Sequence, residues 1–329
     1  MAMSSRSPGV SLLLVLTIAV VLVASCVAEN NPSTGKTVPH EGDWGIYALD
    51  LSTEEVELIW SCGETISHLC LNHAGDEFAF SRKTGGTQDS NEEVFAIGVD
   101  GTGLRQLTTN NYRDLYPSYS PDDSKIAFLS WPGSTLDIYI MNSDGSSQKL
   151  LYDSGFHDAD INWGSGGRIA FTRNSQIWTM KDDGSDARQI TSPPQAGLWG
   201  EGDINLPFGD YDPRFSPDGS KIAFERLDDD TSSHGNYNLY VVDSTGTGEA
   251  KLTDTGYSQG LAIWSHSGDR LVYIVAAIGS AGKYDIYMMD ADGGNARNIT
   301  PDYFPAAFLC HAAMFSKDDS KVYFPGQWY

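Results

Sequence analysis

A repeated hairpin constrains the fold of this chain more than any other feature. Near copies occupy residues 117–128 and 213–224, each with a short strand, a Ser-Pro-Asp turn and a second strand that ends in Ile-Ala-Phe. Proline presets φ in such a turn, and Asp or Gly tolerates its geometry. Four weaker copies bring the number to six, at residues 73–80, 164–171, 265–273 and 316–324.

A second hairpin follows each of the first five copies. It contains an aromatic strand, an Asp-Gly type turn and a short strand that ends near Leu-Thr, as at Leu107-Thr108 and Leu252-Thr253. The unit therefore has four strands and recurs every 43 to 53 residues, which is typical of propeller blades. Residues 45–60 supply only the last two strands of a unit, and residues 314–324 supply only the first two.

These half units predict how the fold closes. We expect an all-β, six-bladed β-propeller over residues 44–329 in which the N-terminal and C-terminal strands share the last blade. Closure of this kind removes the sheet edges that would otherwise be exposed.

The repeat resembles that of the TolB-like family of β-propellers, on its Ser-Pro-Asp-Gly, Ile-Ala-Phe, Ile-Tyr, Asp-Gly and Leu-Thr segments. The resemblance covers roughly residues 44–329. It implies a scaffold in an envelope complex, with a peptidoglycan-associated lipoprotein as the family's type of partner. Propellers with this repeat also include enzymes, so the resemblance predicts the fold more firmly than the function.

The N-terminal residues read as a targeting segment. Arg6 precedes an apolar stretch over residues 12–24, which is too short for a confident membrane span, and residues 23–26 resemble a bacterial lipobox. We expect a lipoprotein signal peptide over residues 1–25, lipidation at Cys26 and a flexible tether over residues 26–43. The propeller would then be exported and lipid-anchored to the cell membrane or outer membrane, in the periplasm or outside the cell.

The charge balance limits the possible partners. The chain has 44 acidic and 21 basic residues, and its net charge is −23 at pH 7. Such a field repels nucleic acids and polyanionic sugars, and it favours cations, basic proteins or neutral ligands. We expect a monomer that binds an envelope protein or a polysaccharide.

Three cysteines remain after Cys26. Closure would bring Cys70 and Cys310 into neighbouring blades, where a disulfide is one possibility and buried thiols are the other, with Cys62 left over.

The longest connection between repeats predicts a binding surface. Residues 192–209 carry about thirteen more residues than the connection at 109–113, and long loops on a rigid scaffold are common binding sites. The alternative is a loop that only covers the blade. The candidate ligand-binding residues in this connection are Trp199, Glu201, Asp203 and Phe208.

Carboxylates also recur at the start of the predicted inner strands. Asp114, Asp158 and Asp210 share one register, Gln259 takes it in the fifth repeat, and His311 falls in the same zone. Two interpretations stay open. The aspartates accept hydrogen bonds from the adjacent connections, or they converge at the channel mouth on a cation, for which Ca²⁺ is the best match.

The sequence favours a non-catalytic binding module that uses this long-loop face. The alternatives are a sugar-binding lipoprotein and a metal-dependent carbohydrate-active enzyme. Oligogalacturonate lyases resemble the chain in their repeat and hold a metal with His and Gln, which His157, Gln259 and His311 could mimic. An anionic uronide would, however, meet a strongly acidic protein with few cationic groups.

Overall fold

The computed structural model describes residues 42–84, 91–197, 208–229, 236–276, 284–304 and 308–328. The chain divides into two compact units, residues 1–34 and 35–329. The first unit lies outside the described residues, and with it the predicted signal peptide and Cys26. In the described part every regular element is a strand. A search of that part for a helix long and apolar enough to cross a bilayer found none.

The repeated turn forms through its own side chains. At the second copy, the Ser120 hydroxyl donates to Asp122 at 2.7 Å and accepts the Lys125 N–H at 2.9 Å. In the other near copy, the Ser216 hydroxyl donates to Asp218 at 2.6 Å and accepts the Lys221 N–H at 3.0 Å. Hydrogen bonds from the serines on either side, Ser120 and Ser124 or Ser216 and Ser220, lower the pKa of each aspartate to about 2. The turn therefore recurs because the same residues satisfy the same backbone groups.

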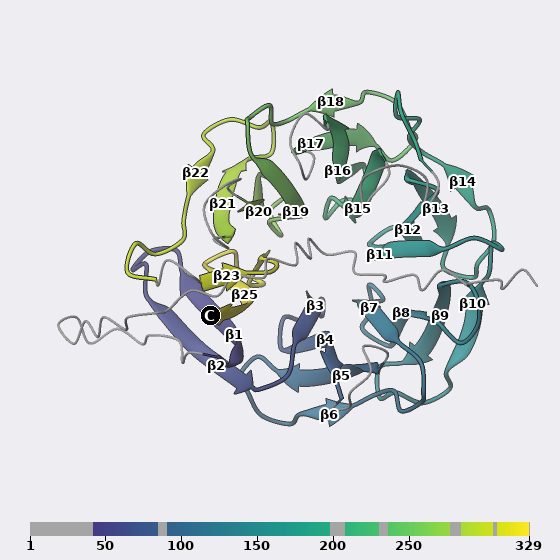
Figure 1. Cartoon of the computed structure of the whole chain (residues 1–329), viewed down its shortest axis with the longest axis horizontal. Coiled ribbons are helices and arrows are strands. Elements are labelled where there is room, and N and C mark those ends of the chain that lie inside the picture. The colour runs from purple at the N-terminus through teal and green to yellow at the C-terminus, as the bar shows by residue number, and fades with distance from the viewer. Residues whose placement is uncertain are drawn as a thin grey trace, which may run out of the picture. The chain divides into compact units, whose positions relative to one another are not determined.

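Four separate sheets contain four strands each, in chain order from the first strand to the last. Figure 1 shows them arranged around a common centre, with β3, β7, β11, β15 and β19 nearest to it. The first sheet comprises β3 (Ile66–Leu71), β4 (Glu77–Lys83), β5 (Glu92–Gly98) and β6 (Arg105–Gln106). The second comprises β7 (Asp114–Tyr119), β8 (Lys125–Ser130), β9 (Asp137–Asn142) and β10 (Lys149–Tyr152). The third comprises β11 (Asp158–Gly164), β12 (Arg168–Arg173), β13 (Gln176–Lys181) and β14 (Arg188–Gln189). The fourth comprises β15 (Gly209–Phe215), β16 (Lys221–Asp229), β17 (Asn236–Asp243) and β18 (Ala250–Lys251).

The fifth sheet has nine strands and contains both ends of the propeller. β1 pairs with β25 over seven residues, from Trp44 opposite Gln327 to Asp50 opposite Lys321. The predicted pairing of the N-terminal and C-terminal strands is therefore confirmed. The strands of this sheet are β1 (Trp44–Asp50), β2 (Val56–Cys62), β19 (Ser258–Trp264), β20 (Arg270–Ala276), β21 (Tyr284–Asp290), β22 (Arg297–Asn298), β23 (Phe308–Cys310), β24 (Met314–Phe315) and β25 (Lys321–Trp328).

The fold is a β-propeller, but the expected count of six separate blades is not confirmed. Instead of a fifth and a sixth sheet, β23 joins the two sets of strands. It pairs with β25 on one side and, through Tyr284 and Leu309, parallel to β21 on the other. The sequence repeat contains no signal for this extra strand, because it lies between two repeats.

The Leu-Thr segments fix the outer strands. The Thr108 hydroxyl accepts the Val94 N–H at 2.9 Å, and Thr191, Thr253 and Thr300 accept the equivalent N–H groups at 2.7 to 3.0 Å. Each threonine thereby pairs a backbone donor at the start of the third strand that would otherwise lack a partner.

Side chains from one sheet also bind the backbone of the next. The Trp163 N–H donates to the Ser118 hydroxyl at 2.8 Å, and the Phe215 N–H donates to the Asn162 carbonyl oxygen at 2.8 Å. The Leu261 N–H donates to Glu225 at 2.9 Å. The first two bonds link successive inner strands, and the third links β16 of the fourth sheet to β19.

Each of the five inner strands nearest the centre carries a β-bulge. The register shifts within β3, β7, β11, β15 and β19, and one residue of each has positive φ between 50° and 56°. Such bulges re-aim the side chain that they contain. The five residues are His68, Tyr116, Asp160, Asp212 and Leu261.

The cysteines do not form the possible disulfide. Cys62, Cys70 and Cys310 are reduced thiols in the structure, so no disulfide joins Cys70 to Cys310. Burial raises the pKa of the Cys70 thiol to about 12, which makes it unreactive.

Candidate functional site

The loops that lead into the inner strands lie at one end of the sheets, which we call the connection face. In the second sheet, Asp114 at the start of β7 lies opposite Ser130 at the end of β8, and Ser130 lies opposite Asp137. The connection 107–113 and the loop 131–136 therefore leave this sheet at the same end. The third sheet repeats the arrangement through Asp158 and Arg173.

The candidate residue Asp114 organises the connection before it. Its carboxylate accepts the Ser130 hydroxyl at 2.5 Å and the Asn110 amide at 2.6 Å. The Asn110 carbonyl oxygen in turn accepts the N–H of Tyr112 at 2.9 Å. Burial raises the pKa of Asp114. Asp114 thus fixes a turn that holds the Tyr112 ring outward.

Gln259 and Asp158 occupy the same place in two other connections. The Gln259 amide donates to the Thr255 hydroxyl at 2.7 Å, and Thr255 accepts the N–H of Tyr257 at 3.2 Å. In the third sheet, the Ser154 hydroxyl accepts the N–H of Phe156 at 3.2 Å and partly offsets the rise in the pKa of Asp158. The same arrangement therefore recurs in three connections. A side-chain oxygen four residues before Asp114, Asp158 or Gln259 accepts the backbone N–H of the aromatic residue that lies between the two.

The aromatic residues held in this way are unusually exposed. Tyr112, Phe156 and Tyr257 have exposed fractions of 40%, 52% and 50%. We call these three residues the aromatic rim. They precede β7, β11 and β19, strands that lie near the centre in Figure 1. The rim was not predicted from the sequence, although two of its members share a local pattern: Asp153-Ser-Gly-Phe and Asp254-Thr-Gly-Tyr are similar tetrapeptides.

The long connection 192–209 is only partly described. Trp199, Glu201 and Asp203 lie outside the described residues, so their predicted role stays a prediction. At the base of the loop, the Gly197 N–H donates to the Phe208 carbonyl at 3.0 Å, and the Ser175 hydroxyl donates to the Gly197 carbonyl at 3.0 Å. Phe208 is half-buried and lies two residues before Asp210. This is the position that the rim residues take in their own connections, two residues before Asp114, Asp158 or Gln259.

Two of the candidate aspartates form buried ion pairs with arginine. Asp158 accepts Arg173 Nε at 2.8 Å, and Asp210 accepts Arg226 Nε and Nη2 at 2.5 and 3.0 Å. Burial raises the pKa of Asp158 to about 6 although Arg173 opposes the rise. Burial also raises the pKa of Asp210, again against its arginine.

The structure does not bring Asp114, Asp158 and Asp210 together as ligands. Each carboxylate is held within its own sheet by the partners just given. Among the described residues, no group of three or more His, Cys, Asp or Glu side chains is placed to hold a metal ion. The geometry matches the interpretation in which these aspartates anchor their own connections, and the Ca²⁺ site has no cluster to support it.

The histidines of the zone pack against aromatic rings. His157 Nδ1 accepts the Leu136 N–H at 3.1 Å and its ring meets Trp131 edge to face at 5.4 Å. The His311 ring lies 4.5 Å from that of Trp44, and burial lowers the pKa of His311 to about 4. Both imidazoles are therefore neutral near pH 7. Among the described residues, neither histidine belongs to a group of three or more His, Cys, Asp or Glu side chains that could hold a metal ion.

A buried carboxylate cluster lies where the bulged strands meet. Asp160, Asp212 and Glu225 are at most 6% exposed. Arg214 Nη2 donates to Asp212 at 3.4 Å, and the Tyr116 hydroxyl donates to the same oxygen at 3.4 Å. Burial raises the pKa of Asp160, raises that of Asp212 well above its usual range with help from the neighbouring carboxylates, and raises that of Glu225 to about 7. The cluster can therefore hold protons near neutral pH.

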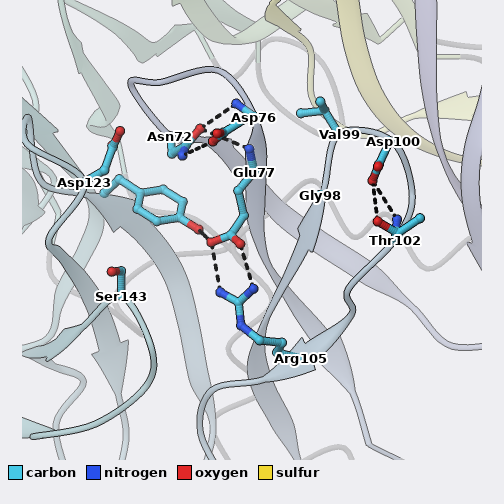
Figure 2. Close-up of a pocket in the computed structure, with 11 residues that line it drawn as sticks. Asn72, Asp76, Glu77, Gly98, Val99, Asp100, Thr102, Arg105, Asp123 and Ser143 are labelled. Carbon is cyan, nitrogen blue, oxygen red and sulfur yellow. Dashed lines mark hydrogen bonds and ion pairs between the residues drawn. The ribbon is translucent and has the colours of Figure 1, made fainter.

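A cavity of about 610 Å³ opens at the other end of the first two sheets, near the hairpin turns. Figure 2 shows Glu77 pointing to Arg105, which donates two hydrogen bonds to it at 2.8 and 3.1 Å. The Tyr119 hydroxyl donates to Glu77 at 2.8 Å, and Asn72 donates to Asp76 at 2.7 Å. Residues of both sheets line the cavity, and these lining groups are hydrogen-bonded to one another.

The fold and the connection face can now be compared with known proteins. No protein family model matches the sequence. A TolB homologue from Chlorobium luteolum is 29% identical over 164 residues, which are 49% of this chain and 33% of the relative. The chain thus matches about a third of that relative's length.

Solved structures agree on the fold. A propeller from Agrobacterium tumefaciens proposed to be TolB superimposes with a TM-score of 0.67 at 18% identity, covering 87% of this chain and 98% of the other. TolB from Acinetobacter baumannii gives a TM-score of 0.57 at 15% identity, covering 88% and 65%. The chain is a β-propeller similar to TolB proteins in sequence and in fold.

Proposed function

We propose that this protein is a non-catalytic, extracytoplasmic binding module that engages an envelope protein through its connection face. The observation that carries the proposal is the aromatic rim, because the same capped turn exposes a ring in three connections. Single exposed apolar residues are common on protein surfaces, but a repeated one at the same place in the fold needs a reason. The similarity to TolB proteins supports a binding role over catalysis.

Export and anchoring complete the proposal. Lipidation at Cys26 would hold the propeller at a membrane, with residues 26–43 as the tether. Trp199, Glu201, Asp203 and Phe208 would extend the binding surface from the long connection. A polysaccharide in place of the protein is the other occupant that this surface could take.

Site-specific photo-crosslinking in cells tests the proposed face. A benzophenone amino acid at Phe156 should yield a discrete crosslinked product with an envelope component, which mass spectrometry would identify. The matched control carries the same group at Leu104, which is 41% exposed between β5 and β6, at the end of the sheet opposite the connection face. Equal products from the two positions would contradict the proposal, and so would the absence of any product from Phe156.

A further inference from the structure

We propose that the aromatic rim, Tyr112, Phe156 and Tyr257, is a docking surface for a basic, extended polypeptide segment whose Lys or Arg side chains lie on the rings. This inference rests on the proposed function and names the chemistry of the partner. Its grounds are the placement of the rings, the charges beside them and the means by which they are held.

The backbone turns that carry the three rings are held by hydrogen bonds. In each connection the N–H of the aromatic residue is capped by a side-chain oxygen, from Asn110, Ser154 or Thr255. The capping residue is tied to the head of an inner strand: Asn110 donates to Asp114, and Gln259 donates to Thr255. The backbone of each turn is thus already ordered, so it loses little conformational freedom when a partner binds.

An exposed carboxylate lies three residues before two of the three rim residues. Asp153 precedes Phe156 by three residues and is exposed, and its carboxylate accepts only a local N–H, from Gly155 at 2.7 Å. Asp254 precedes Tyr257 by three residues and its side chain is 85% exposed, with Lys251 at 2.8 Å as its counter-ion.

Arg113, which follows Tyr112 in the chain, does not offset the negative charge of the exposed carboxylates. Arg113 is bound to Glu92 through Nε at 2.8 Å and through Nη2, and the pair is largely buried. Its positive charge is therefore neutralised inside the protein.

An electron-rich ring face beside a carboxylate attracts cations. Lys and Arg side chains bind over the faces of Tyr and Phe, and a nearby carboxylate adds to the attraction. The net charge of −23 would raise the rate at which a basic segment reaches the face. A neutral glycan could stack on the rings but would gain nothing from Asp153 and Asp254.

Fluorescence anisotropy with the full-length protein tests the proposal. The probe is a short fluorescein-labelled peptide of alternating Lys and Ser, compared with a Glu-Ser peptide and a neutral oligosaccharide. We expect the Lys-Ser peptide to bind most tightly. The combined substitution of Tyr112→Ser, Phe156→Ser and Tyr257→Ser should weaken it about tenfold or more, since an exposed cation–π contact contributes about two- to fivefold.

Matched variants separate the rings from general charge attraction. Leu104→Ser with Leu150→Ser removes two equally exposed apolar side chains elsewhere, with exposed fractions of 41% and 48%, and should leave binding within about twofold. Tyr112→Phe with Tyr257→Phe keeps the rings and should also bind as the wild type does. Asp153→Asn should weaken binding and reduce its dependence on salt concentration. Circular dichroism confirms that each variant is folded.

Three results would overturn the proposal: the same affinity for the triple Ser variant as for the wild type, equal loss in the Leu104→Ser, Leu150→Ser control, or tighter binding of the oligosaccharide than of the Lys-Ser peptide. The proposed function fails in a different way, when Phe156 yields no crosslinked envelope component although the peptide binds through the rim.

Discussion

At the scale of single residues, burial rather than partner charge decides the behaviour of the carboxylates. Glu225 is 6% exposed and accepts the Leu261 N–H at 2.9 Å, yet burial raises its pKa to about 7. Asp160 and Asp212 lie close by, and Arg214 is the cation that partly opposes the rise. The protein therefore keeps a proton here that an exposed glutamate would lose.

This proton makes stability depend on pH. In the unfolded chain Glu225 ionises near its ordinary pKa of 4.5, whereas the folded chain holds the proton to about pH 7. The folded state binds the proton more tightly, so the stabilisation is complete below about pH 4.5 and is lost as the pH rises through about 7. From the size of the shift we expect the free energy of unfolding to fall by about 2–3 kcal/mol between about pH 5 and pH 8.

The Glu225→Gln variant should have a flatter profile, because it keeps an acceptor for Leu261 without a group that ionises. Urea unfolding at several pH values measures this. Glu57→Gln is the control, since the Glu57 side chain is 73% exposed, and it should reproduce the wild-type profile. A wild-type protein that is equally stable at both ends of the range would show that the cluster is not proton-linked.

The ion pair of Asp158 supports a second prediction at this scale. Asp158→Asn leaves the Arg173 charge, whose side chain is 8% exposed, without its counter-ion. Breaking such a buried pair should lower the free energy of unfolding by about 3 kcal/mol.

The control is Asp186→Asn, because Asp186 pairs with Arg168 but its side chain is 50% exposed, and Asn tolerates its φ of 55°. We expect the control to lose less than about 1 kcal/mol in urea unfolding. Equal losses would mean that burial does not set the strength of the pair.

At the scale of elements, the ring closes where β1 meets β25. Tyr47 stacks on Phe324 with ring centroids 5.4 Å apart, and both side chains are at most 2% exposed. Together with Phe308 and Phe315 they form part of one apolar cluster. The C-terminal strand thus contributes both hydrogen bonds and core side chains to the seam.

Deletion of residues 313–329 should abolish cooperative unfolding, because it removes β24 and β25 and exposes the edges of their neighbours. A thermal melt followed by circular dichroism, with size-exclusion chromatography, measures the effect. Phe324→Ala is the graded comparison and should keep the fold while losing about 3–5 kcal/mol. A truncated chain that stays monomeric and melts cooperatively would contradict closure through β25.

Much of this element order follows from the sequence, because a repeated turn sets strand positions within one or two residues. The residues 45–50 and 55–60, which have no first hairpin before them, were predicted as strands of a shared sheet, and β1, β2 and β25 confirm it. The β23 strand could not be predicted, since its parallel pairing with Tyr284 depends on tertiary proximity alone.

The candidate site was harder to predict than the strands. Asp114, Asp158 and Asp210 were found by their register, but their partners stand at the far end of the second strand, as Ser130, Arg173 and Arg226 do. The sequence does not show whether each carboxylate forms an ion pair with an arginine or binds a metal cation from solution. The rim was overlooked because aromatic residues in propellers usually pack inside, and exposure is a property of the fold.

At the scale of the whole molecule, the propeller and the N-terminal unit raise separate questions. Residues 35–329 form the compact unit that contains every described strand, and residues 1–34 form the other. The charge of −23 and the aromatic rim bear on what the propeller binds. The N-terminal unit contains Cys26, on which the proposed anchoring depends.

Acylation of Cys26 would attach the protein to a membrane, because buried acyl chains supply the binding energy. Metabolic labelling with a fatty acid that carries an alkyne should mark the wild-type protein, and Cys26→Ser should lose the mark. The control is Cys62→Ser, which removes a half-buried thiol of β2 and should keep it. Mass spectrometry of the mature N-terminus should place the acyl groups on Cys26. Label retained by Cys26→Ser, or absent from the wild type, would rule out this anchor and leave the connection face to act without one.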